Sequence, residues 1–225
     1  MSDLLRAEAV SKTWSAGGPA PVHAVRDAAL AVTGGEMVVI TGPSGSGKTT
    51  LLAMLAGLLR PDRGRVVLDG LDLTAASEKA RRQARLTRLG FVFQRGLLLQ
   101  HLSARDNVAL VLRAAGTPRR LARGRADELL DRLGLRDRAG FYPAALSPGE
   151  CQRVAVARAL VPGPRLVLAD EPTAHLDSTT GLRVVEELRR LASAGGAGVV
   201  VVTHDARLAT AASRVMRLED GRLLA

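Results

Sequence analysis

The chain has 225 residues, a length that suits one domain or one domain with an embedded subdomain. Hydrophobic residues make up 47% of it but aromatic residues only 2%, so its core must consist mainly of Leu, Val and Ala. The single cysteine, Cys151, excludes an internal disulfide and a cysteine-clustered zinc site, and we expect it to be a small packing residue.

The formal net charge of +10 comes almost wholly from arginine, because the only lysines are Lys12, Lys48 and Lys79. Such a balance permits contact with nucleic acid, an anionic membrane face or an acidic partner. Since the arginines are scattered and no base-stacking aromatic residues lie between them, we do not expect nucleic-acid binding. A general arginine bias in the coding genome would produce the same excess.

Membrane-spanning segments are not expected. The longest apolar runs, such as Leu166–Ala169 and Gly198–Val202, are far shorter than the roughly 20 residues that a spanning helix needs. The N-terminus has no basic region followed by an apolar stretch and a cleavage site, so no secretory signal is predicted. We therefore expect a cytoplasmic protein.

In chain order, the first thirty residues read as a small antiparallel layer with a turn at Gly17-Gly18-Pro19. Short β-branched runs bounded by turn residues follow, with helical patterns between several of them, which indicates βαβ units and a mainly parallel sheet in an α/β fold. These runs are Glu36–Thr41, Arg65–Leu68, Gly90–Phe93, Leu166–Ala169, Gly198–Thr203 and Arg214–Leu218. No internal repeat or linker is visible, so residues 1–225 are predicted to form one domain.

A phosphate-binding loop is predicted between the strand Glu36–Thr41 and a Leu-rich helix, Thr50–Leu59. The segment from Gly42 to Thr49 matches G-x-x-x-x-G-K-[ST] in full. In such a P-loop, backbone N–H groups and the helix N-terminus face the phosphates, the lysine reaches the β- and γ-phosphates, and the hydroxyl after it binds Mg²⁺. The predicted nucleotide contacts are Gly42, Pro43, Ser44, Gly45, Ser46, Gly47, Lys48, Thr49 and Thr50.

Helical signals replace strand signals between about Arg95 and Ala157. Thr117 and Pro118 read as a cap and first-turn pair for one of these helices. We expect a helical subdomain inserted into the sheet domain at residues 95–157.

An acidic pair follows the apolar strand Leu166–Ala169. Asp170 is predicted to hold Mg²⁺, usually through water, and Glu171 to polarise the water that attacks the γ-phosphate. An acidic pair after a strand is by itself more often a cap or a turn, and its conjunction with the P-loop is what favours phosphate chemistry.

The residues between the P-loop and the acidic pair resemble the motifs of one protein family. The segment from Leu146 to Arg153, Leu-Ser-Pro-Gly-Glu-Cys-Gln-Arg, is similar to the signature L-S-G-G-[QE]-x-Q-R of the ATP-binding-cassette (ABC) ATPases. Other segments resemble the remaining family motifs in the family's order, over about Leu4 to Leu223. Gln94 resembles the Q-loop glutamine, Ala174–Asp177 the D-loop, His204 the switch histidine and Trp14 the aromatic residue that stacks on adenine.

This resemblance implies the ABC ATPase fold and a set of roles. Gln94 would contact Mg²⁺ or water and transmit the nucleotide state to the helical subdomain, His204 would sense the γ-phosphate, and Trp14 would stack on adenine. Ser147, Gly149, Glu150 and Asp177 would meet ATP bound by a second subunit, so the active site is complete only in a head-to-tail dimer. His175 is interpreted as a variable D-loop position.

Pro148 replaces the first glycine of the signature. Ser147 as N-cap, Pro148 at the first helical position and Glu150 as the reciprocal partner predict a capping box that begins a helix running to about Leu160. The lost N–H donor weakens the contact with the partner's phosphate by about 1 kcal/mol. A weak or non-hydrolysing ATPase is the alternative, and the presence of Glu171 and His204 argues against it.

The family implies a motor subunit that hydrolyses ATP with Mg²⁺ and drives a separate integral-membrane permease, as a homodimer or with a homologous partner, on the inner face of the cell membrane. The compact length and the closing segment Leu218–Leu223 resemble the small ATPases of lipoprotein release, macrolide export and cell division, so export or mechanical transmission is favoured over import. A regulator of a membrane complex that transports no solute, and a non-transport ABC ATPase, are the alternatives.

Overall fold

The computed structural model describes residues 3–15, 21–94, 96–174 and 176–224. Its strands are β1 (Leu5–Trp14), β2 (Val22–Val32), β3 (Met37–Thr41), β4 (Arg63–Leu68), β5 (Leu71–Asp72), β6 (Leu89–Val92), β7 (Leu166–Asp170), β8 (Gly198–Val202), β9 (Arg214–Glu219) and β10 (Arg222–Leu224). Its α-helices are α1 (Lys48–Leu55), α2 (Glu78–Thr87), α3 (Ala104–Ala114), α4 (Arg119–Arg132), α5 (Pro148–Leu160), α6 (Ser178–Gly195) and α7 (Ala206–Ala211), with 3₁₀ turns η1 (Arg136–Arg138) and η2 (Pro143–Ala145).

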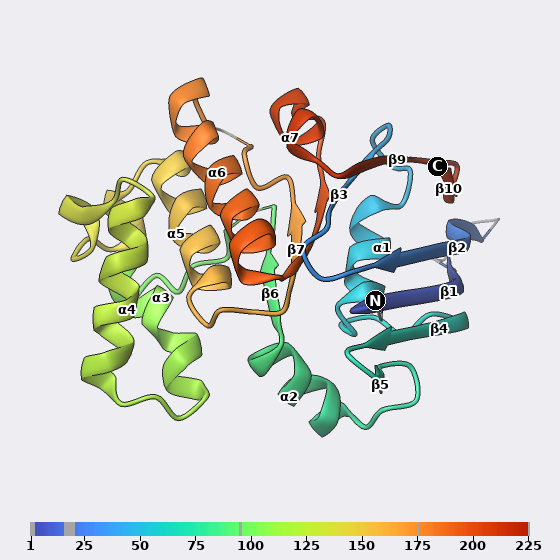
Figure 1. Ribbon diagram of the computed structural model, residues 1–225, viewed down its shortest axis with the longest axis horizontal. Helices are drawn as coiled ribbons and strands as arrows, with labels where there is room; N and C mark the ends of the chain where they lie inside the picture. Colours follow the sequence, from blue (N-terminus) through green and yellow to red (C-terminus); the bar gives the residue numbers. More distant parts are fainter. Residues whose placement is uncertain (1–2, 16–20, 95, 175, 225) are drawn as a thin grey trace.

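Two sheets form the frame of the molecule (Figure 1). The larger has the order β10-β9-β3-β8-β7-β6, and its strands from β9 to β6 run parallel, with β10 antiparallel at the edge. The smaller has the order β2-β1-β4-β5 and is antiparallel throughout. The predicted mainly parallel sheet and N-terminal antiparallel layer are therefore confirmed, whereas the predicted turn at residues 17–19 lies outside the described residues.

The strand Arg65–Leu68 does not belong to the parallel sheet, as its place in the βαβ rhythm suggested. It forms most of β4, which pairs antiparallel with β1. The burial of β4 explains the difference: its first three residues are exposed, whereas Val66 and Leu68 are buried. A strand with one solvated face suits an antiparallel sheet, because parallel strands are usually buried on both faces.

The central strands β3, β7 and β8 divide the core into two layers. Alternate residues of each strand face opposite sides, so Val38 and Val200 pack with α1 and the antiparallel sheet, whereas Val39 and Val201 pack toward α5 and α6. Helix α1 contacts both sheets. It begins at Lys48 and ends at Leu55, earlier at both ends than predicted, because Gly47 caps it in the left-handed region and Gly57 leaves the helix with a φ of +62°.

Helices α3, α4 and α5 pack on one another at the side of the molecule away from the antiparallel sheet (Figure 1). Helix α4 begins at Arg119, so the predicted cap and first-turn pair is displaced by one residue: Pro118 is the N-cap, since its ψ of 142° is extended. The prediction of an inserted subdomain at 95–157 stays a prediction, and its first residue, Arg95, lies outside the described residues.

A buried asparagine ties the segment before α3 to that helix. The Asn107 side chain is fully buried, its amide nitrogen donates to the carbonyl oxygens of Leu99, Leu102 and Ser103 at 2.9–3.1 Å, and its oxygen accepts the Leu99 N–H at 2.8 Å. One side chain therefore supplies the partner of the Leu99 N–H and of the Leu102 carbonyl, and adds a second hydrogen bond to the carbonyls of Leu99 and Ser103.

We expect Asn107→Ala to lower the free energy of unfolding by about 2–3 kcal/mol, because it leaves buried backbone groups without partners. Urea unfolding followed by circular dichroism measures this change. The control is Gln100→Ala, which removes an exposed amide from the same segment and should change stability by less than about 0.5 kcal/mol. Equal effects of the two substitutions would contradict the structural role of Asn107.

Candidate functional site

The P-loop lies where β3 meets α1. Gly47 has a φ of +101°, and a Cβ at this position would lie 1.9 Å from the Ala24 carbonyl oxygen, so only glycine fits. The Lys48 ammonium donates to the carbonyl oxygens of Gly42 and Pro43 at 2.8 and 2.7 Å. Burial lowers the pKa of Lys48, and the nearby carboxylates of Glu171 and Asp170 oppose that shift. The lysine is thus held at the loop beside two acidic groups.

Thr49 and Asp170 join the P-loop to the end of β7. The Thr49 hydroxyl donates to the Asp170 carboxylate at 2.6 Å, although the two residues are 121 positions apart. The Ser46 side chain is also buried, and its hydroxyl has no hydrogen-bond partner among the described residues. Buried hydroxyls normally have partners, so the Ser46 hydroxyl fits a loop that receives a polar ligand such as phosphate.

Glu171 occupies a strained position directly after β7. Its φ is +47°, which is uncommon for a residue with a side chain and must be stabilised by the surrounding structure. Its carboxylate accepts the Thr203 hydroxyl at 2.8 Å and the His204 N–H at 3.4 Å. The His204 Nε2 lies 3.7 Å from the other carboxylate oxygen. The acid and the histidine are therefore neighbours across the ends of β7 and β8.

A cleft of about 630 Å³ collects these groups. The predicted site residues that line it are Trp14, Ser44, Gly45, Gly47, Lys48, Thr49, Thr50, Gln94, Asp170, Glu171 and His204. Trp14 has 44% of its surface exposed at the end of β1, with the Lys12 ammonium 5.5 Å from its ring centroid. A flat exposed ring, a basic phosphate loop and an acidic strand end thus share one opening.

Seven predicted residues do not line this cleft, and three of them, Gly42, Pro43 and Ser46, belong to the P-loop beside it. The other four lie at two helix N-termini. Ser147, Gly149 and Glu150 lie at the N-terminus of α5, and Asp177 is the N-cap of α6. The predicted capping box is confirmed: the Glu150 N–H donates to the Ser147 hydroxyl at 3.2 Å and the Ser147 N–H to the Glu150 carboxylate at 2.7 Å, with Pro148 in the first turn. His175 lies outside the described residues.

The capping box is braced from η1. Arg138 donates to the Glu150 carboxylate at 3.0 Å and lies over the Phe141 ring, 4.8 Å from its centroid. The Ser147 hydrogen bonds and Arg138 lower the pKa of Glu150, which keeps it ionised. Cys151 is half-buried, and its thiol donates to the Pro143 carbonyl at 3.6 Å, in keeping with a packing role.

Sequence reasoning missed several members of the site. Thr203 donates to Glu171, and Thr173 donates to Asp205 at 2.7 Å behind it. Val22 and Ala24 line the cleft from β2. Their residue types carry no chemical signal, and only the proximity of Thr203 and Asp205 to His204 in the sequence could have drawn attention to them.

Comparison with known proteins identifies the class to which this fold and site belong. The sequence pattern of the family described as ABC transporter matches residues 25–174. The chain therefore belongs to the ABC transporter family, and it is an ATP-binding ATPase subunit of that family.

Two relatives and one solved structure show which members of the family this chain is similar to. The chain is 44% identical over 225 residues to the lipoprotein-releasing system ATP-binding protein LolD of Cereibacter sphaeroides, covering 100% of both chains. It is 46% identical to LolD of Bordetella avium, covering 98% of this chain and 95% of that protein. Its structure superimposes on the ATP-binding cassette MJ0796, in a dimeric post-hydrolysis state bound to ADP and Pi, with a TM-score of 0.93, 37% identity, and coverage of 97% and 96%.

Proposed function

We propose that this chain is the motor of a lipoprotein-releasing ABC transporter, hydrolysing ATP to drive a separate membrane permease. The observation that carries the proposal is the convergence of Lys48, Thr49, Asp170, Glu171 and His204 on one cleft. The likeness to LolD proteins over the whole chain supports the choice of lipoprotein release.

In this proposal each residue of the cleft has a distinct role. Lys48 exchanges a loop carbonyl for oxygens of the β- and γ-phosphates, and the backbone from Gly42 to Thr50 surrounds the phosphates. Trp14 stacks on adenine at the open end. Glu171 accepts a proton from water as that water attacks the γ-phosphate, while His204 donates to the developing charge.

Mg²⁺ fits the oxygen donors at the inner end of the cleft. Thr49 and Asp170 offer a hydroxyl and a carboxylate, which are hard oxygen ligands, and Gln94, which lines the same cleft, would offer an amide oxygen. A bound Mg²⁺ would neutralise charge on the phosphates. The Thr49–Asp170 hydrogen bond holds these two oxygens together beforehand.

The four predicted site residues that lie outside both the cleft and the P-loop support a composite site. Ser147, Gly149 and Glu150 begin α5, whose N-terminus favours an anion, and they point to a phosphate held by a second subunit rather than by this one. Asp177 belongs to the same proposed interface. The dimeric state of MJ0796 supports an ATP-bound dimer, and we propose a homodimer.

A second cleft, of about 460 Å³, supports contact with a permease. It lies between α2, β6, α3 and α5 and is lined by Leu58, Arg82, Arg85, Leu86, Leu89, Gly90, Phe91, Phe93, Leu97, Val111, Ala114, Arg158, Ala159 and Pro162. Gln94 lies in the nucleotide cleft and Leu97 in this second one, three residues later. Arg158 donates to the carbonyls of Gly96 and Leu97 at 2.6 and 2.9 Å, so the connection is braced.

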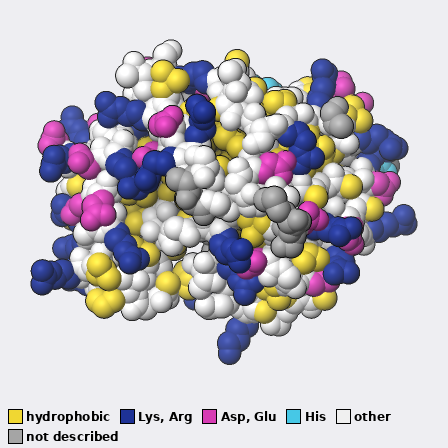
Figure 2. Space-filling model, viewed as in Figure 1, with side chains coloured by type: hydrophobic (Ala, Val, Ile, Leu, Met, Phe, Trp, Pro, Cys, Tyr) yellow, Lys and Arg dark blue, Asp and Glu magenta, His cyan; other side chains and the backbone are white. Residues whose placement is uncertain are grey.

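The surroundings of the two clefts agree with this assignment. Among the helices of the described ranges, none combines the length and the apolar character that spanning a bilayer requires. Lys and Arg side chains are spread over the face seen in Figure 2 with acidic residues among them, rather than gathered in one basic patch. We propose a location on the inner face of the cell membrane, bound through the permease.

The first test is ATP-dependent dimerisation by size-exclusion chromatography. Glu171→Gln should dimerise with ATP in the absence of Mg²⁺, because it binds nucleotide without turnover, and the wild type should release phosphate when Mg²⁺ is added. Lys48→Ala in the Glu171→Gln background should not dimerise. If no dimer forms and no phosphate is released, the proposal of a self-sufficient homodimer is contradicted.

Restoring glycine in the signature should tighten the dimer. Pro148→Gly in the Glu171→Gln background supplies an N–H at the α5 N-terminus, so we expect the dimer dissociation constant with ATP to fall about fivefold, measured by analytical ultracentrifugation. Pro118→Gly, at the start of α4, is the matched control and should leave it unchanged. An unchanged constant for Pro148→Gly would show that this position does not contact phosphate.

A charged side chain in the second cleft should weaken binding to the permease without affecting ATP hydrolysis. Leu58 has 47% of its surface exposed there, so Leu58→Asp should fold normally but reduce binding to membrane vesicles from the producing cells about tenfold, measured by sedimentation. Leu224→Asp changes a leucine of the same exposure, 47%, in β10 and should bind as the wild type does. Equal binding of both variants would contradict docking at this cleft.

A further inference from the structure

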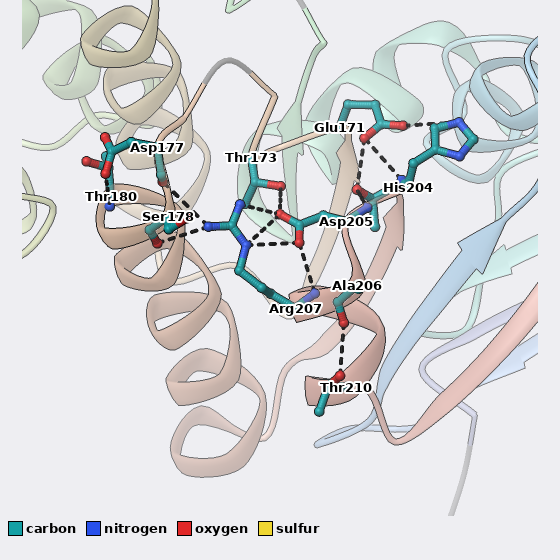
Figure 3. A network of polar contacts seen from close by, with 11 residues as sticks. Glu171, Thr173, Asp177, Ser178, Thr180, His204, Asp205, Ala206, Arg207 and Thr210 are labelled. Atoms are coloured by element: carbon teal, nitrogen blue, oxygen red, sulfur yellow. Dashed lines mark hydrogen bonds and ion pairs between the residues drawn. The ribbon is translucent and has the colours of Figure 1, made fainter.

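A single arginine connects the segment after β8 with the start of α6 (Figure 3). The Arg207 guanidinium donates to both carboxylate oxygens of Asp205, through Nε at 2.9 Å and Nη2 at 2.6 Å. Its Nη1 donates to the carbonyl oxygen of Ser178 at 2.9 Å and lies 3.5 Å from that of Asp177. The three nitrogens thus bind two segments that are about thirty residues apart in the sequence.

The first turn of α6 is shaped to admit this side chain. Gly181 is buried in α6, and a Cβ on it would lie 2.4 and 2.6 Å from the two terminal nitrogens of Arg207. Glycine inside a helix is less favourable than alanine by about 1 kcal/mol. Since the three heavy atoms nearest to such a Cβ all belong to this guanidinium, the arginine is what a side chain at Gly181 would meet first.

Asp205 extends the connection to the reacting groups. Its carboxylate accepts the Thr173 hydroxyl at 2.7 Å, and its backbone N–H donates to the Thr203 hydroxyl at 3.0 Å. That hydroxyl in turn donates to Glu171. Hydrogen bonds from Arg207 lower the pKa of Asp205 to about 2, so the carboxylate is ionised throughout the physiological range. Figure 3 shows the continuous chain of contacts from the α6 N-terminus to His204.

We propose that Arg207 is a positioning residue that couples Asp177 to Glu171 and His204. Arg207 holds the first turn of α6 against the segment after β8. A displacement of Asp177 is therefore transmitted to Glu171 and His204. The proposal rests on the proposed hydrolysis at this cleft and adds to it a mechanical link within the subunit. Arg207 touches neither nucleotide nor Mg²⁺ site, since the residues that line the nucleotide cleft do not include it.

The substitution Arg207→Ala should reduce kcat for phosphate release about tenfold, because the reacting groups lose their fixed placement, and should leave KM for ATP within about twofold. Arg207→Lys keeps a positive charge beside Asp205 but has one nitrogen, so it should not restore the rate. The matched control is Arg214→Ala: Arg214 also binds a carboxylate, that of Glu36, and a backbone carbonyl, but at the opposite end of β3. It should keep the wild-type kcat.

Gly181→Ala tests the same contact from the other side. Alanine favours the helix, so the thermal midpoint should not fall, yet the methyl group displaces the guanidinium and kcat should fall about as far as in Arg207→Ala. The double variant Gly181→Ala/Arg207→Ala should equal Arg207→Ala alone, because both remove one contact.

The outcomes separate this inference from the proposed function. Three outcomes would overturn the role of Arg207 while leaving the ATPase intact, provided that the wild type releases phosphate. They are an unchanged kcat in Arg207→Ala, a full rescue by Arg207→Lys, and additive losses in the double variant. A loss of rate that only follows a loss of thermal stability would also overturn it. Absence of phosphate release from the wild type would overturn the proposed function and, with it, the role of Arg207.

Discussion

The site depends on the parallel pairing of β3, β8 and β7. The register places Ile40 beside Val202, and Val202 beside Asp170, so the carboxyl ends of three strands meet at one edge of the sheet. The P-loop, the acidic pair and the segment carrying His204 all leave from this edge. Binding at such an edge is general in open α/β sheets, because the loops after adjacent parallel strands converge there. The pairing is stabilised by near-complete burial of both faces of these strands.

Polar groups at this edge hydrogen-bond to one another. Thr49 binds Asp170, Thr203 binds Glu171, and Thr173 binds Asp205. Each hydroxyl fixes one carboxylate, and each pair joins segments distant in sequence. Glu171 combines this restraint with a left-handed backbone, which the surrounding structure must stabilise. Such restraint reduces the reorganisation that the reaction would otherwise require.

The signature helix shows how a departure from the family pattern is accommodated. Pro148 has no N–H, but the first turn of a helix has donors without intrahelical partners, so the loss breaks no hydrogen bond within α5. The capping box and Arg138 keep the helix N-terminus in place. The change therefore leaves α5 and its N-terminal capping intact.

The sequence by itself determined the elements whose physics is local. A glycine-rich loop between a strand and a helix, a capping box within four residues from Ser147, and apolar runs of β-branched residues all depend on near neighbours, and the structure has them where they were predicted. Glu171 and His204 were each given a role at the γ-phosphate, and the two side chains lie close together.

Tertiary structure alone decided the rest. The sequence of β4 predicts a strand but does not identify its partner. Pairing with β1 depends on how the two segments are placed in the folded chain. The contact of Arg207 with Gly181 joins residues 26 positions apart, and neither residue type indicates it in advance. The cleft beside Leu58 gathers side chains from four elements. Local sequence cannot encode these features, because each depends on the distance between segments that only packing brings together.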